Sequence, residues 1–245
     1  MNRSGAGRGP LRLPRITAGR LTRGWAGPGG TRLRLVRPGE ATRVEQLLHV
    51  AGIPLDPELT GLIDLGDTAT AVLQGLTDGP DRLLGLLANA LAAGDPTSVL
   101  PSLVTVLVAV NRIGALVGAL LAAPPATVLS TAAAGGVALE RVMFGAAAVT
   151  TVQALAVDPA ARRRGIGTAL LERCTQLYEH LGFYLVCGQF RAGSGLETYY
   201  SRRGFDVLPL GEGISLTRLG LPVRISAGSS ERLFFRWRTG APSPR

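Results

Sequence analysis

The sequence predicts an α/β fold, in which helices flank a sheet within one folded region, residues 31–238. Residues 148–190 have the pattern strand, arginine- and glycine-rich loop, helix, strand, and a unit of this kind places its two strands parallel and adjacent. Residues 102–122 form two apolar runs around Asn111-Arg112, which indicates an antiparallel hairpin. Apolar residues at helical spacing in 41–51 and 81–93 predict the covering helices.

Residues 1–30 are rich in glycine, proline and arginine, and they predict a disordered basic tail. The net charge is +9, and all 26 basic residues are arginine. Nine of them precede the first acid, Glu40, and the other 17 balance the 17 acidic residues, so we assign the basicity to the N-terminal region. An inert tail is favoured over a nucleic-acid-binding arm, because Trp25 is its only aromatic residue.

The elements in the first half of the folded region are predicted from the alternation of apolar and polar residues and from the proline and glycine residues that end each element. The alternating run TRLRLV predicts a strand, which Pro38 and Gly39 end. Residues 52–80 indicate a loop with one short helix. The charge-free run 113–139 is interrupted by paired prolines and paired glycines, so it predicts a core hairpin followed by an alanine-rich helix or loop rather than a membrane span. In order, the elements expected here are a strand at 31–36, helices at 41–51, 67–76 and 81–93, and strands at 102–110 and 113–122.

The second half follows the same reasoning. Its long helix has one apolar face and stops at Gly182. Cys174 and Cys187 lie in apolar positions, so we expect two buried thiols and neither a disulfide nor a metal site. In order, the elements expected here are a strand at 148–157, a helix at 166–181, a strand at 183–190, a helix at 196–203, a strand at 205–208, an irregular segment at 209–230, a strand at 231–238 and a tail at 239–245.

The loop before the long helix has the chemistry of an anion site. The first amides of a helix lack intrahelical partners and carry partial positive charge. Gly165 and Gly167 leave that backbone uncovered, and the arginines at 162–164 add charge beside it. The alternative is a solvent-facing loop without a ligand. A Rossmann site is excluded because the G-x-G-x-x-G pattern is absent, and a P-loop is excluded because the chain contains no lysine.

Three segments together resemble the GCN5-related N-acetyltransferases: VDPAARRRGIGTALL, FYLVCGQF and YYSRRGF. The family's loop pattern, Arg/Gln-x-x-Gly-x-Gly/Ala, matches Arg162, Gly165 and Gly167. The family's tyrosine before a Gly-Phe pair matches Tyr200. The order of elements agrees over residues 31–238, and the resemblance is sharpest over 148–206.

The resemblance implies a mixed, mostly antiparallel sheet of six or seven strands, in which the parallel strands 148–157 and 183–190 splay apart. It implies that acetyl-CoA, as co-substrate, lies in that cleft. The loop backbone would hold the pyrophosphate, residues 155–157 would pair with the pantetheine, and the Val157 amide would face the thioester carbonyl. The cofactor-binding residues that it implies are Leu155, Ala156, Val157, Arg162, Arg163, Arg164, Gly165, Ile166, Gly167 and Thr168.

For catalysis, the resemblance implies that Tyr200 is the acid that protonates the departing thiolate, since a phenol has a pKa of about 10. Tyr199 is expected to pack. Gln153 stands where the family often carries a carboxylate, and we expect it to orient the substrate or a water. The general base is left unassigned. Gly193 stands where the family often has asparagine, so that side-chain contact to the cofactor is not expected.

The expected function is transfer of an acetyl group from acetyl-CoA to a primary amine of a small molecule or protein. The alternative is a non-catalytic acyl-CoA-binding sensor or interaction module of the same fold, and a third is a nucleic-acid-binding protein that acts through the tail. We expect a cytoplasmic protein, since no apolar segment of a secretion signal follows the early arginines. No metal and no membrane partner are expected, and a homodimer is left open.

Overall fold

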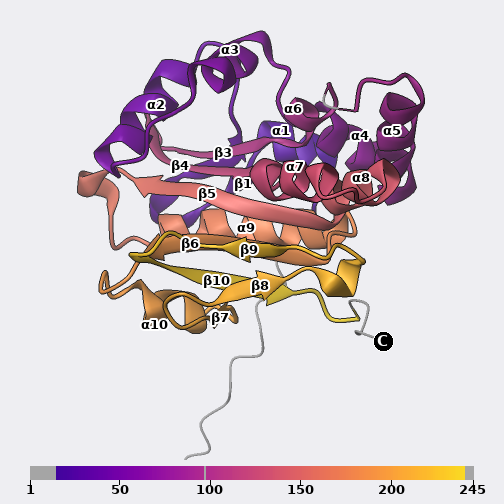
Figure 1. The fold of residues 1–245 in the computed structure, drawn as a ribbon. Coiled ribbons are helices and arrows are strands. Elements are labelled where there is room, and N and C mark those ends of the chain that lie inside the picture. Colours follow the sequence, from indigo (N-terminus) through magenta and orange to yellow (C-terminus); the bar gives the residue numbers. More distant parts are fainter. Residues whose placement is uncertain (1–14, 97, 241–245) are drawn as a thin grey trace, which may run out of the picture.

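An eight-stranded sheet forms the centre of the protein in the computed structural model, which describes residues 15–96 and 98–240. Its strand order is β1-β2-β3-β4-β5-β6-β10-β7, and every neighbouring pair is antiparallel except β5 and β6 (Figure 1). The expected mixed, mostly antiparallel sheet with one parallel pair is confirmed, with eight strands in place of six or seven. The strands are β1 Trp25–Ala26, β2 Arg32–Leu35, β3 Thr105–Val110, β4 Leu116–Ala123, β5 Val149–Val157, β6 Leu185–Arg191, β7 Asp206–Val207 and β10 Glu231–Trp237.

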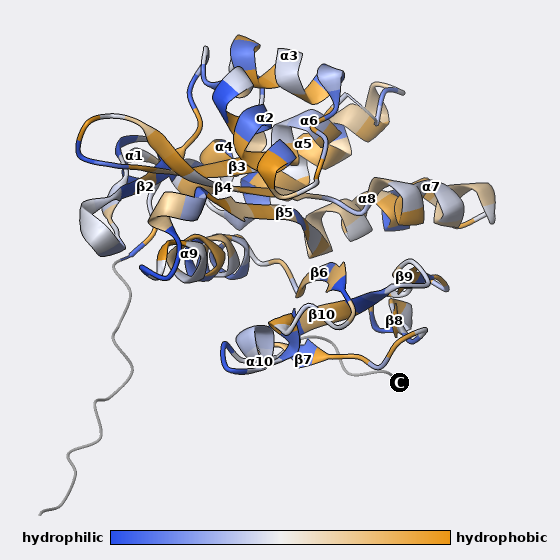
Figure 2. Cartoon of the chain, turned by 90° about the vertical axis from the view of Figure 1, so that its left-hand side faces the viewer, coloured by the Kyte–Doolittle hydropathy of each residue, from blue (hydrophilic) through white to orange (hydrophobic). Residues whose placement is uncertain are grey.

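Helices cover both faces of this sheet. Figure 2 shows α2 and α3 on one side of β3, β4 and β5, and α9 on the other. The helices are α1 Ala18–Arg23, α2 Ala41–Val50, α3 Pro57–Leu65, α4 Thr70–Asp78, α5 Pro80–Ala92, α6 Leu100–Leu103, α7 Ala126–Ala134, α8 Leu139–Ala148, α9 Ile166–His180 and α10 Leu196–Ser201. In the described part of the chain, none of these helices combines the length and apolar character needed to cross a bilayer.

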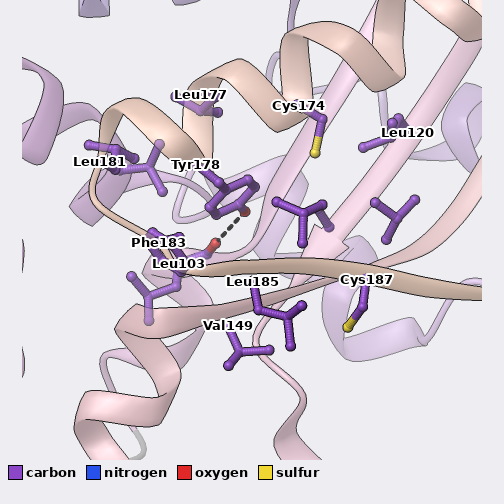
Figure 3. Close-up of a cluster of buried hydrophobic side chains, with 14 of the residues drawn as sticks. Leu103, Leu120, Val149, Cys174, Leu177, Tyr178, Leu181, Phe183, Leu185 and Cys187 are labelled. Atoms are coloured by element: carbon purple, nitrogen blue, oxygen red, sulfur yellow. Dashed lines mark hydrogen bonds between the residues drawn. The ribbon is translucent and has the colours of Figure 1, made fainter. Parts of the chain in front are cut away.

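The larger core packs the apolar face of α9 against the sheet (Figure 3). The Tyr178 ring is fully buried there, and its hydroxyl lies 3.2 Å from the carbonyl oxygen of Leu103 and 2.9 Å from the hydroxyl of Thr105. Cys174 and Cys187 are both buried and unpaired, as the sequence predicted. A second core, under α2, fills the opposite face of the sheet. The two cores fix α9 and β5, the elements on either side of the glycine-rich loop.

The parallel pair β5–β6 is short, and its end opens the sheet. Pairing runs from Val149 opposite Leu185 to Val152 opposite Gly188, while β5 and β6 each continue beyond it. A Cβ at Gly188 would collide with the Phe234 ring and lie 2.7 Å from the Val152 carbonyl oxygen. Only glycine therefore fits where the two strands part.

A bulge in β5 accompanies this opening. Leu121 of β4 pairs with Ala154, but the next residue, Ala122, pairs with Val152. Gln153 is consequently left without a partner in β4, and its side chain is exposed. A bulge re-aims a side chain and increases the local twist, and here it lies at the residue where the parallel pairing ends.

The prediction of a disordered tail over residues 1–30 is wrong for residues 15–30, and residues 1–14 lie outside the described part. Thr17 caps α1 by accepting a hydrogen bond from the Arg20 amide. Leu21 is fully buried, Trp25 is 5% exposed and pairs with Leu33 of β2. The segment is poor in apolar residues, but these are placed to face the core, which an average composition does not reveal.

Two further segments are more ordered than predicted. Within residues 52–80, α3 is an additional helix: Asp56 caps it by accepting from the Glu58 amide, and Gly66 closes it in a left-handed conformation. The segment 209–230, predicted as irregular, contains a two-stranded sheet of β8 (Gly213–Ser215) and β9 (Arg224–Ser226). Of the predicted tail 239–245, residues 241–245 lie outside the described part.

Candidate active site

The loop between β5 and α9 leaves the start of the helix open. Gly165 has a left-handed backbone, with φ at 81°, and precedes the first residue of α9. The first helical hydrogen bond runs from the Ala169 amide to the Gly165 carbonyl oxygen, at 2.9 Å. Within the described residues, the amides at 166–168 donate to no acceptor. Three amides at the positive end of the helix dipole are thus available to an anion.

A cavity of about 710 Å³, here called the α9 cavity, lies over this helix start. Nine of the ten predicted cofactor-binding residues line it, and so does Tyr200. The complete lining is Ala51, Leu155, Ala156, Val157, Ala161, Arg162, Arg163, Gly165, Ile166, Gly167, Thr168, Leu196, Tyr199, Tyr200 and Arg203.

Arg164 is the predicted cofactor residue that does not line the α9 cavity. It lines a separate cavity of about 370 Å³, and its Cδ would lie 3.6 Å from a Cβ placed at Gly29. Arg163 has a left-handed φ of 60°, which turns the chain between Arg162 and Arg164. The cations of the α9 cavity are therefore Arg162, Arg163 and Arg203.

Gly167 keeps the floor of the α9 cavity free. A Cβ there would lie 3.5 Å from Val157, 3.6 Å from the Tyr199 hydroxyl and 3.9 Å from Leu155. A side chain at this position fits sterically but would fill the space between helix and strand. The cavity can therefore accept an extended ligand that lies directly against the backbone.

The free edge of β5 presents backbone polar groups to the same space. The Asp158 amide donates to the Val117 carbonyl oxygen at 3.0 Å, so it faces β4. Because successive residues of a strand face opposite neighbours, the polar groups of Leu155 and Val157 face away from β4, toward the gap before β6. The Val157 carbonyl accepts a 3.0 Å hydrogen bond from Arg162 Nε.

A second cavity of about 710 Å³, the β6 cavity, continues from the first between the separating strands. The two share Ala51, Leu155, Leu196 and Tyr200, so they meet at these residues. Gln153, the predicted substrate-orienting residue, lines the β6 cavity. The complete lining is Ala51, Gly52, Ile53, Pro54, Val152, Gln153, Ala154, Leu155, Gln189, Phe190, Arg191, Ser194, Leu196, Tyr200 and Glu231.

Tyr200, the predicted acid, is 6% exposed and lies where the two cavities meet. Its ring stacks on Phe234 with centroids 3.7 Å apart, and on Phe190 at 5.3 Å. Burial raises the pKa of its hydroxyl above the ordinary value. Tyr200 is consequently protonated at neutral pH and fixed in place by the packing of its ring.

Tyr199 packs, as expected, and is also one of the residues that line the α9 cavity. The Arg203 guanidinium lies over its ring at 3.6 Å, and Arg203 Nε donates to the Thr168 hydroxyl at 3.1 Å. The Tyr199 hydroxyl is buried without a hydrogen-bond partner among the described residues. Burial also raises its pKa. The buried ring of Tyr199 thus helps to fix Arg203 and α10 against the start of α9.

Sequence reasoning missed Arg203 and Glu231. Arg203 lies inside the segment YYSRRGF, and its distance from the loop in sequence concealed its contact with Thr168. Glu231, 31 residues beyond Tyr200, belongs to no motif. In the described part of the chain, no three His, Cys, Asp or Glu side chains gather where they could hold a metal ion.

Comparison with known proteins agrees with this geometry. Residues 105–207 match a family model described as an acetyltransferase (GNAT) domain. No curated protein matches the sequence. Among solved structures, NAA60 of Arabidopsis thaliana, in complex with a bisubstrate analogue, is 14% identical, with 84% of this chain and 97% of that chain covered and a TM-score of 0.50.

Two other solved structures are similar at a lower TM-score of 0.46. Ard1 from Thermoplasma volcanium is 13% identical, over 85% of this chain and 97% of that chain. The putative acetyltransferase yncA from Salmonella typhimurium, solved with its cofactor acetyl-CoA, is 14% identical, over 89% and 99%. At 14% sequence identity, the similarity of this chain to NAA60 shows a shared fold and nothing about its substrate.

The matched residues include both features described above: the open start of α9 after β5, and the parallel pair of β5 and β6 that separates beside it. The match covers residues 105–207 and identifies this part of the chain as similar to an acetyltransferase (GNAT) domain.

Proposed function

We propose that the protein is an acetyl-CoA-dependent N-acetyltransferase that acts on a primary amine of a small molecule or a protein. The observation that carries this proposal is the joined pair of cavities, which runs from the open start of α9 through the gap between β5 and β6. One end presents amides and three arginines, and the other is lined by one cation, Arg191, and one carboxylate, Glu231. Such a cleft suits a phosphorylated donor and a separate acceptor that meet in the middle.

The residues of the α9 cavity fit acetyl-CoA. The amides at 166–168 would hold the pyrophosphate, with Arg162 and Arg163 beside them. The outward-facing amides of Leu155 and Val157 would pair with the pantetheine as a neighbouring strand does. Acetyl-CoA would supply an acetyl thioester. The acceptor nitrogen would form a bond to the acetyl carbon, the C–S bond would break, and the electron pair of that bond would leave with the sulfur.

Tyr200 would complete this reaction by moving protons. Its hydroxyl proton goes to the departing sulfur, and the phenolate then takes the proton that the nitrogen loses as it becomes an amide nitrogen. The Val157 amide would stabilise the negative charge that develops on the acetyl oxygen.

The unpaired cysteines support a reducing compartment, and we place the reaction in the cytoplasm.

The decisive experiment measures the melting temperature with acetyl-CoA, and then the release of coenzyme A in a panel of amines. The variant is Gly167→Glu, because a carboxylate there enters the α9 cavity without backbone strain. Its matched control is Gly61→Glu in α3, which also adds a carboxylate to a helix but meets nothing within 4 Å. We expect acetyl-CoA to stabilise the wild type and Gly61→Glu, and to stabilise Gly167→Glu much less.

Equal stabilisation of all three proteins would contradict this assignment of the cofactor site. Stabilisation without coenzyme A release from any amine would instead favour the non-catalytic acyl-CoA-binding module. The two measurements separate binding from transfer. The shift in melting temperature that acetyl-CoA causes reports its binding to the folded protein, whereas coenzyme A release reports the reaction.

A further inference from the structure

Acetyl transfer to an amine requires a group that accepts a proton from the amine. Gln153 stands where the resemblance to the family leads one to expect a carboxylate in that role. A primary amine has a pKa of about 10, so it reaches the protein as an ammonium ion and must lose a proton before its nitrogen can attack. An amide side chain cannot accept that proton. The following inference rests on the proposed function and identifies the group that does.

Glu231 is the single carboxylate among the residues that line either cavity, and no histidine is among them. It is the first residue of β10, half-buried, and lies opposite Arg191 of β6 in the strand register. Both side chains line the β6 cavity, which also contains Gln153 and Tyr200. The strand register thus places one anionic group at the wall of the cavity that we assign to the acceptor.

The Glu231 carboxylate accepts a backbone hydrogen bond and is in no ion pair with a described residue. Its Oε2 accepts a hydrogen bond from the Gly228 amide at 3.3 Å. The ion pairs found between described residues join Arg34 with Glu40, Arg43 with Asp158, Arg232 with Glu197, and Arg236 with Glu179. Glu231 is in none of them, and its Oε1 has no hydrogen-bond partner in the described part of the chain. One carboxylate oxygen is therefore available to a ligand.

We propose that Glu231 binds the ammonium group of the acceptor and accepts its proton. The Glu231 carboxylate takes one proton from the ammonium nitrogen, which frees the electron pair that forms the bond to the acetyl carbon. Glu231 then releases this proton to solvent, while Tyr200 exchanges its own proton as described above. One proton is released in each turnover, as conversion of an ammonium ion and a thioester into an amide and a thiol requires.

The test compares Glu231→Gln, which keeps the shape but removes the charge, with Glu231→Asp, which keeps the charge. Glu58→Gln is the matched control, because Glu58 lines a different cavity, which shares only Gln153 with the β6 cavity. The probes are butylamine, phenethylamine, spermidine and an unblocked tetrapeptide. For each protein we would measure acetyl-CoA affinity by calorimetry, coenzyme A release, and the melting-temperature shift that each amine causes in the presence of coenzyme A.

Glu231→Gln is expected to lower kcat/KM by about 100-fold or more, with unchanged acetyl-CoA affinity and loss of the amine-induced shift. Glu231→Asp should recover part of the activity, and Glu58→Gln should behave as wild type. Amine binding and turnover by Glu231→Gln at wild-type levels would overturn the role of Glu231, as would a wild type that binds none of the amines. Failure of the wild type to bind acetyl-CoA would instead overturn the proposed function, and the amine shifts would still test Glu231.

Discussion

Tyr200 and Glu231 reach one cavity from elements that are far apart in the sequence. Tyr200 comes from α10 and is fixed by aromatic packing, whereas Glu231 comes from the first residue of β10 and is fixed by a backbone hydrogen bond. Of the two, Tyr200 could be predicted because it belongs to a local motif. Glu231 could not, since its place depends on the register of β10 against β6, which no short sequence pattern encodes.

Tyr200→Phe is expected to lower kcat by about 100-fold while acetyl-CoA affinity stays close to that of wild type. The variant retains the ring that stacks on Phe234, so the free energy of unfolding should change by less than about 1 kcal/mol. Steady-state kinetics, calorimetry and urea unfolding would measure the three quantities. Tyr184→Phe, outside both cavities, is the control; equal kcat values for the two variants would exclude Tyr200 as the acid.

Between elements, α10 is joined to the start of α9 by Arg203. This side chain lies over the Tyr199 ring and donates to the Thr168 hydroxyl, two interactions that a planar guanidinium can make at once. It thereby closes one wall of the α9 cavity. Lysine has the same charge but cannot reproduce the stacked, forked geometry.

Arg203→Lys should therefore weaken acetyl-CoA binding by about 10-fold, corresponding to the loss of one charge-assisted hydrogen bond. Arg202→Lys is the matched control, since the neighbouring side chain is exposed and lines neither cavity. Calorimetry on both variants would measure the effect. If both bind acetyl-CoA with the same affinity, the guanidinium geometry at Arg203 is unimportant for the site.

A second element-scale prediction concerns Gly188, where β5 and β6 part. Gly188→Ala would push a methyl group into the Phe234 ring and against the Val152 carbonyl oxygen, so it should destabilise the fold by about 1–3 kcal/mol. Gly85→Ala in α5 meets nothing within 4 Å and should instead stabilise it, by about 0.5–1 kcal/mol. Urea unfolding would measure both, and a neutral Gly188→Ala would show that the strands can shift to accept a side chain.

Most elements could be predicted from local pattern, and the misses have physical causes. The helix α3 was missed although Asp56, Pro57 and Gly66 are its start and stop signals, because its interior contains a glycine and two acids that weaken the apolar period. The segment 15–30 was misjudged because its order comes from contacts with β2 and α4, which composition does not show. For Arg164, the direction of the side chain depends on the left-handed turn at Arg163.

For the whole molecule, buried groups that stay protonated predict a loss of stability at alkaline pH. Burial raises the pKa of Cys187 to about 12 and raises the pKa values of Cys174, Tyr178 and Tyr200. The unfolded thiols lose their protons near pH 8.5 and the unfolded phenols near pH 10, so above about pH 8.5 the unfolded state binds fewer protons than the native state. Stability is then lost as pH rises, by about 1.4 kcal/mol per pH unit for each affected group.

Urea unfolding between pH 7 and 10.5 would show this as a midpoint that is flat below about pH 8.5 and falls above it. The double variant Cys174→Ala, Cys187→Ala should be less stable at neutral pH, because it leaves small cavities. Its midpoint should nevertheless fall less steeply between pH 8.5 and 9.5. A wild-type midpoint that stays constant to pH 10.5 would contradict the raised pKa values.

The short pairing of β5 with β6 also makes the protein's own architecture incomplete. Four residue pairs join β5 and β6. Beyond Val152 and Gly188, the facing edges of these two strands are not paired with each other. A pantetheine chain laid along residues 155–157 would take the place of the missing strand, so the bound donor would be a structural member as well as a reactant. Its binding free energy would then add directly to that of folding. The fraction of unfolded protein would then fall as the concentration of acetyl-CoA rises.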